Sequence, residues 1–423
     1  MPDDLQGPVR ISRYMWAIVP LLVISALINY VDRSNLSIAA PVIEREFGLS
    51  SIQIGSLLSA FFWTYALMQV TGLAGWLTDR FPVGWVMLGG YVLWSVATFA
   101  TGFTSSFATL FLTRLLLGIG ESIAYPCYSR IFVELPQHMR GRANSFIDAG
   151  TKLGPAAGAF LGGLLLVHAG WRMLFFVLGA GGLLWAPLWI LAMPKYERRT
   201  NQRRAPQFTS IFKLLGMRSA WGSFIGHFAG NYFFYFLLAW LPIYLVREEN
   251  MSIGSMSRMA SAIFLLIASS TVVAGFASDR LISAGVSATG ARLSMAAGGL
   301  AVASSLIAIG FVHRDLHLSI AIMALACVGY GAFSSNHWAI TQTLAGPSMA
   351  GRWGSLQNGI ANFAGIIAPW VAGAVAQFYG SLRIAFVIAG CVALMGACAW
   401  VFLVRSVEPV QWDALSYASG AKP

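Results

Sequence analysis

An acid and a base stand next to each other in the middle of an apolar stretch near the start of the chain. The pair is Asp32 and Arg33, and nearly every residue of segments 15–27 and 36–40 on either side is apolar. A charged side chain at the centre of a bilayer costs roughly 3 kcal/mol or more, so such residues generally face a water-filled cavity or a partner and mark the path of an ion or substrate. The pair therefore predicts a site within a membrane-spanning helix.

The side chains around Arg33 suit an anion that carries hydroxyl groups. A guanidinium binds a carboxylate through two parallel N–H donors. Tyr30 and Asn29 precede Arg33 by three and four residues, so on a helix they share its face. That face can recognise hydroxyl groups as well as negative charge. An architectural ion pair that holds helices together is the alternative interpretation of Asp32 and Arg33.

A second acid and base, Arg114 and Glu121, lie seven residues apart in another apolar stretch. Seven residues are close to two helical turns, so both side chains point to one side of the helix, roughly 10 Å apart along its axis. Burial disfavours the charged form of a carboxyl group, so a desolvated Glu121 could load and release a proton, whereas Arg114 stays charged. The spacing leaves room for a substrate or a partner from another helix. A static structural pair is the alternative.

A third pair, Asp148 and Lys152, has the i, i+4 spacing with the acid first, which is the favourable order for an ion pair on a helix. We interpret it as a self-neutralising pair that makes membrane insertion tolerable. The alternative is that Lys152 adds a positive charge for a second carboxylate on the substrate.

The second half of the chain offers neutral polar groups. His227, Asn231 and Tyr235 recur every four residues and form a polar stripe on an apolar helix. We expect Asn231 and Tyr235 to recognise hydroxyl groups, whereas a buried histidine such as His227 is more often a core residue. Further candidates in later apolar stretches are Asn336, His337, Trp338, Gln357, Asn358 and Asn362. Such groups, opposite a charged first half, fit a polyhydroxylated acid.

The composition is that of a membrane protein. Of the 423 residues, 57% are hydrophobic and 10% charged, and the mean hydropathy is +0.69. At about 20 residues per crossing, the chain has room for about a dozen spans and for no folded domain outside the membrane. The four cysteines lie in apolar stretches, and His138, His168, His313 and His317 are scattered in predicted loops, so we expect no metal, no cofactor and no enzyme.

The net charge of +11 lies in the connecting loops, where it indicates orientation rather than nucleic-acid binding. The N-terminal tail carries Arg10 and Arg13, and the segment Lys195 to Arg218 carries seven basic residues against one acid. Both belong in the cytoplasm, so the number of crossings between them is even and six fit. We expect both termini on the cytoplasmic side of the bacterial inner membrane.

Charged residues, prolines and glycines divide the sequence into twelve apolar segments. We expect these segments to form an all-α fold of two six-helix bundles. We expect a bundle at 1–193, a basic cytoplasmic linker at 194–218, a second bundle at 219–404 and a cytoplasmic tail at 405–423. The predicted spans are 14–40, 53–77, 84–103, 107–133, 141–167, 171–193, 219–246, 257–284, 291–312, 316–345, 351–378 and 382–404.

Internal repeats support this division. The pattern G-x-x-x-D-R occurs as Gly75 to Arg80 and again as Gly275 to Arg280, at an offset of 200. At an offset of 210, Gly141-Arg142 recurs as Gly351-Arg352, and Gly170 recurs as Gly380. Parallel repeats of this kind are typical of transporters that alternate their access around a midplane site.

The repeated motif resembles the signature of the major facilitator superfamily. The resemblance covers essentially the whole chain and implies that Asp79, Arg80, Asp279 and Arg280 are gating residues. One departure is visible, because Pro82-Val83-Gly84-Trp85 stands where basic residues usually follow the motif.

Three further segments are similar to the anion:cation symporter branch of that superfamily, which includes proton-coupled galactonate and hexuronate carriers of bacteria. They are Asn29 to Leu36, Arg114 to Glu121 leading to Tyr125-Pro126, and Trp240 to Leu245. The resemblance implies that Arg33 contacts the anion, that Asp32 accepts a proton, and that Glu121 is the coupling acid with Arg114 as its partner. It also places Trp338 and Asn362 at binding positions, whereas His337 departs from the branch.

These interpretations converge on a carrier that takes up a sugar acid, an aldonate or a hexuronate, together with protons, and acts as a monomer. Uptake of an aromatic or other small carboxylate, and export or antiport by the same fold, are the alternatives.

Overall fold

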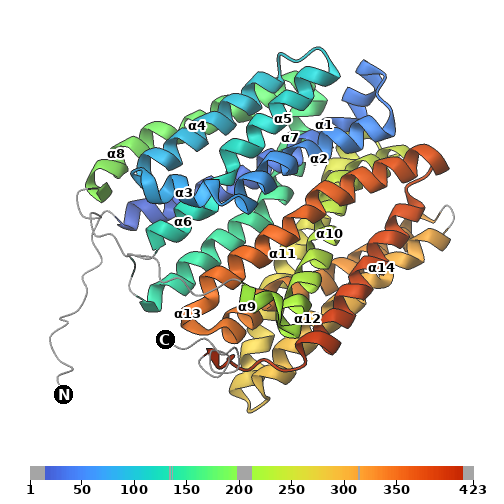
Figure 1. Ribbon diagram of the computed structural model, residues 1–423. Coiled ribbons are helices and arrows are strands. Elements are labelled where there is room, and N and C mark those ends of the chain that lie inside the picture. Colours follow the sequence, from blue (N-terminus) through green and yellow to red (C-terminus); the bar gives the residue numbers. More distant parts are fainter. Residues whose placement is uncertain (1–14, 133–134, 136, 198–211, 313–314, 413–423) are drawn as a thin grey trace. The chain divides into compact units, whose positions relative to one another are not determined.

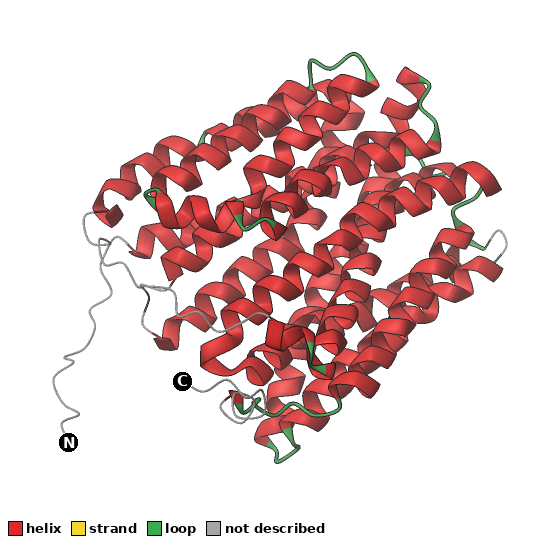
Figure 2. Cartoon of the chain, in the orientation of Figure 1, coloured by secondary structure: helices red, strands yellow, loops and turns green. Residues whose placement is uncertain are grey.

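The computed structural model describes residues 15–132, 135, 137–197, 212–312 and 315–412, and every regular element among them is a helix (Figure 2). The first six are α1 (Met15–Phe47), α2 (Ser51–Val70), α3 (Leu73–Arg80), α4 (Val83–Thr101), α5 (Phe107–Ser122) and α6 (Ala124–Phe132). The next six are α7 (Gln137–Leu183), α8 (Trp185–Glu197), α9 (Phe212–Leu215), α10 (Arg218–Arg247), α11 (Ile253–Ser283) and α12 (Ala288–Ala303). The remaining elements are the 3₁₀-helix η1 (Ser304–Phe311), α13 (Leu316–Tyr379), α14 (Arg383–Ala399) and the π-helix η2 (Trp400–Val404).

Eleven helical segments of the described residues are long and apolar enough to cross a membrane. The longest, Ala143–Met193, has 51 residues, which is more than two crossings need at about 20 residues each. Gly170 breaks this segment, with a φ of 80°. Counted as two, the segment brings the number of spans to the twelve expected, and the prediction of an all-helical membrane protein is confirmed.

Two predicted spans are interrupted. The second span ends at Val70 and restarts as α3, because Gly72 has a φ of 71°, in the left-handed region that glycine adopts readily. The fourth span divides into α5 and α6 at Ile123. Pro126 lies just inside α6 and has no N–H to donate to the carbonyl four residues earlier, which favours the break.

The helices group into two compact units. Unit 1 comprises Met1–Ala205, Leu237–Leu265 and Pro369–Ser381, and unit 2 comprises Pro206–Phe236, Leu266–Ala368 and Leu382–Pro423. The division into bundles at 1–193 and 219–404 stays a prediction. Arg10, Arg13 and His313, and most of the predicted linker and tail, lie outside the described residues.

Within unit 1, α1 packs along α7, α2 packs along α5, and α4 contacts both α5 and α7 (Figure 1). Glycines on α7 permit the close approach of α1. A Cβ added at Gly154 would lie 2.5 Å from the Cβ of Tyr30, and one added at Gly158 would lie 3.2 Å from the Cα of Val31. Small residues allow helix backbones to come together in this way. The contact fixes the height and rotation of the polar segment of α1.

The predicted repeat of Gly170 as Gly380 has a counterpart in the backbone. Gly170 has a φ of 80° and Gly380 a φ of 70°, so both have the positive φ that glycine adopts readily. Each lies where one long helix gives way to the next. The two halves of the sequence thus turn at equivalent glycines.

Candidate functional site

Arg33 of α1 lies in an aromatic cage formed by α1 and α2. Its guanidinium carbon is 4.5 Å from the ring centre of Tyr30, 4.7 Å from that of Phe61 and 4.9 Å from that of Tyr65. Each cation–π contact contributes on the order of 0.5 to 2 kcal/mol, and more when the cation is desolvated. The three rings therefore hold the guanidinium in place and replace part of its lost hydration.

Arg33 also forms an ion pair with Glu121 of α5. Its Nε donates to Glu121 Oε2 at 2.8 Å, and the two side chains are 3% and 0% exposed. Removing one partner of such a buried pair costs about 3–5 kcal/mol, because the other charge is left uncompensated. The resemblance pointed to Arg114 as the partner of Glu121, and the structure instead gives the ion pair to Arg33.

Arg114 lies on the same helix as Glu121 and is also buried. Its Nη2 donates to Thr101 Oγ1 of α4 at 3.0 Å, and its guanidinium carbon is 5.4 Å from the ring centre of Phe175. Asp32 and Glu121 both attract Arg114 electrostatically. The prediction from spacing, that one side of α5 presents both an acid and a base, agrees with these contacts.

Asp32 completes the charged cluster, which we define as Asp32, Arg33, Arg114 and Glu121. Its carboxylate is 2% exposed and accepts from Asn35 Nδ2 at 3.1 Å. Arg114 attracts Asp32, whereas Glu121 repels it. With all four groups ionised the cluster has no net charge, and the uptake of one proton makes it positive.

The charged cluster retains unused capacity for hydrogen bonds. Among the described residues, the buried atoms in or beside the cluster that have no hydrogen-bond partner include Arg114 Nε, Glu121 Oε1, Asn29 Nδ2 and Asn35 Oδ1. Buried polar atoms are nearly always satisfied by protein, water or ligand. Arg114 Nε and Asn29 Nδ2 are nitrogen donors, so an anion could accept hydrogen bonds at this place.

Asp148 and Lys152 of α7 are both half-buried. The Asp148 carboxylate accepts from Thr151 Oγ1 at 3.5 Å. Neither residue is among the contacts of the charged cluster given above, and their role stays a prediction.

Unit 2 brings together several of the predicted neutral groups. Tyr235 of α10 donates from its hydroxyl to Asn362 Oδ1 of α13 at 3.0 Å, and Asn362 Nδ2 donates to the Asn358 carbonyl at 2.8 Å. Asn231 is half-buried on α10. Asn336 is buried and donates to Ser335 Oγ at 2.7 Å.

Two histidines form the centre of a second group in unit 2, which we call the histidine cluster: His227, His337, Trp338 and Gln357. The ring of His227 lies 4.5 Å from that of His337 and 5.0 Å from that of Trp338, measured between centres. His227 Nδ1 is 3.4 Å from Gln357 Nε2, and Gln357 Oε1 accepts from Thr341 at 2.8 Å. The cluster is polar but carries no carboxylate, arginine or lysine of its own.

The expected gating residues lie elsewhere. Asp79 and Arg80 end α3, Asp279 and Arg280 lie near the end of α11, and all four are exposed. The residues before them repeat the same order of buried and exposed positions in both copies, at 73–80 and 273–280. The gating role stays a prediction.

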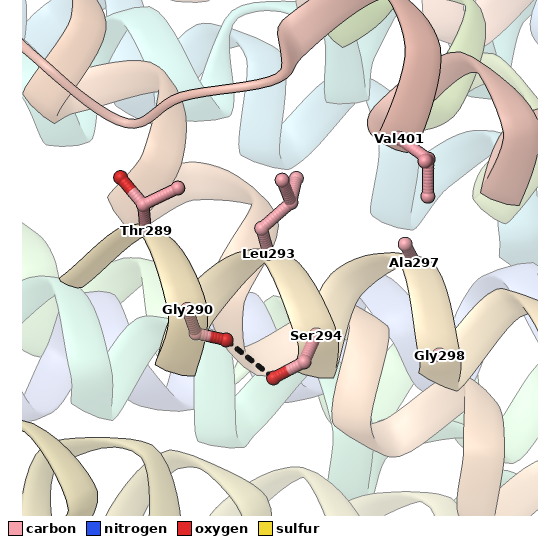
Figure 3. A pocket seen from close by; sticks show the side chains of 7 residues that line it. All are labelled: Thr289, Gly290, Leu293, Ser294, Ala297, Gly298 and Val401. Atoms are coloured by element: carbon pink, nitrogen blue, oxygen red, sulfur yellow. Dashed lines mark hydrogen bonds between the residues drawn. The ribbon is translucent and has the colours of Figure 1, made fainter. Parts of the chain in front are cut away.

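A hollow of about 370 Å³ lies on the α12 side of unit 2 (Figure 3). It is lined by Thr289, Gly290, Leu293, Ser294, Ala297, Gly298 and Val401. None of the predicted site residues lines it, and its walls carry no charge. Among the described residues, no three His, Cys, Asp or Glu side chains are grouped so that they could hold a metal ion.

Two sets of residues near the charged cluster were not predicted from the sequence. Phe61 and Tyr65 of α2 complete the cage around Arg33, but a lone tyrosine in an apolar helix gives little signal. The other set lies on α4, where polar positions recur at helical spacing from Tyr91 to Thr101. That periodicity was available in the sequence.

One family model and several known proteins match this chain over most of its length. Residues 22–367 match the family model described as Major Facilitator Superfamily. The probable galactarate/D-glucarate transporter GarP of Escherichia coli (strain K12) is 30% identical over 433 residues, which are 95% of this chain and 96% of that protein. The D-galactonate transporter of Escherichia coli O6:H1 is 30% identical over 438 residues, covering 97% and 99%.

A solved structure agrees with the fold. It is a bacterial homolog of the human lysosomal transporter Spinster, in an inward-facing and unoccupied conformation. The two chains superpose with a TM-score of 0.76 at 19% sequence identity, over 93% of this chain and 98% of the other.

Proposed function

The chain belongs to the major facilitator superfamily, and on that premise we propose that it takes up a sugar acid, an aldonate or a hexuronate, together with protons by alternating access. It would do so as a monomer in the bacterial inner membrane with both termini in the cytoplasm. Relatives named for galactarate, D-glucarate and D-galactonate support an acid of this class.

The observation that carries the proposal is the buried ion pair between Arg33 and Glu121. Glu121 occupies the guanidinium that is best suited to a substrate carboxylate, so the two carboxylates compete for Arg33. A proton on Glu121 removes its charge and weakens the pair. Arg33 can then bind the substrate, which couples the binding of the anion to the binding of a proton.

Arg114 and Asp32 would also contribute to the coupling of anion binding to proton binding. Arg114 keeps an unused donor, Nε, and is attracted to both acids of the charged cluster. Protonation of Asp32 would leave Arg114 with less competition and raise the net charge of the cluster further. An anion entering the charged cluster is therefore favoured when its acids carry protons.

The neutral groups of unit 2 suit the hydroxyl groups of a sugar acid. Tyr235, Asn362 and Trp338 offer hydroxyl, amide and indole groups that can bind hydroxyl groups without adding charge. Asn231 and the histidine cluster are further candidates of the same kind. Sugar acids bear several hydroxyl groups per carboxylate, so this composition favours them over an aromatic acid.

Uptake into proteoliposomes tests the proposal. Radiolabelled D-galactonate, galactarate, D-glucuronate and benzoate are compared, each with and without an imposed pH gradient. We expect accumulation of at least one sugar acid only when the outside is more acidic than the lumen. Accumulation of benzoate alone, or accumulation that an inward proton gradient does not increase, would contradict the proposed function.

A further inference from the structure

One face of α4 inside unit 1 carries four buried polar side chains. Tyr91, Trp94, Ser95 and Thr98 are spaced at i, i+3, i+4 and i+7, so they share one face and span about 10 Å of the helix. Each is 0% or 1% exposed. In the part of the chain that the structure describes, Tyr91 Oη, Trp94 Nε1, Ser95 Oγ and Thr98 Oγ1 all lack a hydrogen-bond partner.

This polar face begins at the charged cluster. Thr98 Oγ1 faces the Asp32 carboxylate but lies outside hydrogen-bond geometry. Thr101, one turn further along α4, accepts from Arg114. At the other end, Tyr91 is close enough to Asp32 and to Tyr128 of α6 to interact electrostatically with both. The face therefore runs from Asp32 toward the start of α4.

Neighbouring helices close the face without satisfying it. Gly182 of α7 lies opposite, and a Cβ added there would be 2.9 Å from Ser95 Oγ and 3.9 Å from the Tyr91 hydroxyl. Tyr128 shares a hydrogen bond of 2.8 Å with Ser25 of α1. Because glycine has no side chain, the α7 backbone approaches the polar atoms of α4 closely at Gly182.

Buried polar groups in proteins are hydrogen-bonded to protein or to ordered water, and four unsatisfied groups on one face are exceptional. We propose that Tyr91, Trp94, Ser95 and Thr98 bind a file of water molecules along α4, through which Asp32 gains and loses its proton. The route is distinct from the Arg33–Glu121 pair. The inference rests on the proposed function, because it assigns a path to the proton of the proposed symport.

Each proton transfer along the file conserves its atoms. The water next to Asp32 gives one hydrogen to a carboxylate oxygen, which forms an O–H bond there, and accepts a hydrogen from the next water. Each water again holds two hydrogens, and one proton has entered at the Tyr91 end. Release of the proton is the reverse sequence. Ser95 and Thr98 can act as both donor and acceptor, while Trp94 only donates.

The charged and titratable groups around Asp32 are those already named: Arg33 of α1, Arg114 and Glu121 of α5, Tyr91 of α4 and Tyr128 of α6. None of the residues of the α4 face is itself charged. Replacing Ser95 and Thr98 therefore changes the path of the proton and removes no charge from the charged cluster.

The test separates proton movement from substrate movement. Proteoliposomes that contain wild type or S95A/T98V are compared in two assays. The first measures uptake of D-galactonate or galactarate driven by a pH gradient. The second measures exchange of the same acid with equal pH on both sides. We expect gradient-driven uptake by S95A/T98V to be about tenfold slower, a typical effect of losing buried hydrogen-bond partners. Exchange should remain within twofold of wild type, because it needs no net proton transfer.

A second variant tests the same proposal without removing a polar group, and a control variant removes a buried hydroxyl elsewhere. Gly182→Ala removes no polar group but places a methyl group against Ser95 Oγ, which must shift, so it should also slow gradient-driven uptake. Ser37→Ala removes a buried hydroxyl of α1 that is already bonded to the carbonyl of Ser34, and it should match wild type in both assays.

The outcomes are distinct. If S95A/T98V and Gly182→Ala both match wild type in gradient-driven uptake, or if exchange falls as much as gradient-driven uptake in both, the water file is refuted. If wild type takes up acid without any response to the gradient, the proposed coupling itself fails, and the file loses its role.

Discussion

The two polar clusters of this protein differ in the kind of group that they bury, charged in unit 1 and neutral in unit 2. The charged cluster of unit 1 buries two arginines and two acids, and the Arg33–Glu121 ion pair and the aromatic rings around Arg33 compensate for part of the lost hydration. The histidine cluster and the Tyr235–Asn362 pair of unit 2 bury neutral hydroxyl, amide and imidazole groups, with hydrogen bonds from Tyr235 to Asn362 and from Thr341 to Gln357. A nearby proton or anion should therefore change the energy of the charged cluster more than that of the neutral groups of unit 2.

The largest expected effect follows from the removal of positive charge from unit 1. Arg33→Ala and Arg114→Ala should each reduce uptake of sugar acids at least 100-fold, because the substrate carboxylate loses a buried, charge-assisted partner. Initial rates in proteoliposomes measure this. Arg258→Ala, at an exposed position of α11, is the control and should retain wild-type rates. Residual transport above a tenth of wild type in either variant would contradict an anion site in the charged cluster.

Glu121→Gln should separate anion binding from proton binding. The amide cannot ionise, so Arg33 is released from the ion pair at every pH. Substrate affinity, measured by quenching of tryptophan fluorescence, should then stay at its low-pH value when the pH rises, whereas in wild type it weakens. Uptake should lose its response to the gradient while exchange persists. Glu408→Gln, at an exposed acid, is the control. Gradient-driven accumulation by Glu121→Gln would show that Glu121 is not the coupling acid.

The stability of unit 1 should depend on the same Arg33–Glu121 ion pair. Arg33→Ala leaves a buried carboxylate without its partner and should lower the free energy of unfolding by about 3–5 kcal/mol. Adding Glu121→Gln in the same chain should recover most of this loss, because the uncompensated charge is gone. Thermal unfolding in detergent compares the single and double variants. Equal loss in both would mean that packing, not charge, accounts for the effect.

In unit 2 the expected effects are smaller. Tyr235→Phe removes the donor to Asn362 and leaves a buried amide oxygen unsatisfied, which typically costs 1–3 kcal/mol. Affinity for galactarate should fall about tenfold, while competition by adipate, the same diacid without hydroxyl groups, should be unchanged. A matching loss for both acids would argue against a role for Tyr235 in the recognition of hydroxyl groups.

The smallest effect is expected at His227. His227→Gln keeps a polar group beside Gln357, and the histidine cluster carries no fixed charge that depends on it. Uptake of D-galactonate should stay within threefold of wild type at neutral pH. A loss as large as that of Arg33→Ala would move His227 into the essential machinery and erase the contrast between the two clusters.

The sequence predicted the helices, the repeats and the four members of the charged cluster, because rare charges in apolar stretches are strong signals. It did not predict that Glu121 pairs with Arg33. That choice depends on the rotation of α1 against α5, which the glycines of α7 help to set and which residue spacing within one helix does not contain. The cage of Phe61 and Tyr65 was invisible for a similar reason, since aromatic residues in membrane helices are common. The break at Gly72 shows that a continuous apolar segment can still contain an interruption of the helix.

The aromatic cage around Arg33 has a consequence for speed. A cation that exchanges one carboxylate for another must pass through a moment when it has neither. With three rings within 5 Å of its guanidinium, Arg33 keeps an electron-rich surrounding during that moment and does not need to recruit water. In the proposed mechanism, the exchange of Glu121 for an incoming acid would then need little movement of the Arg33 side chain.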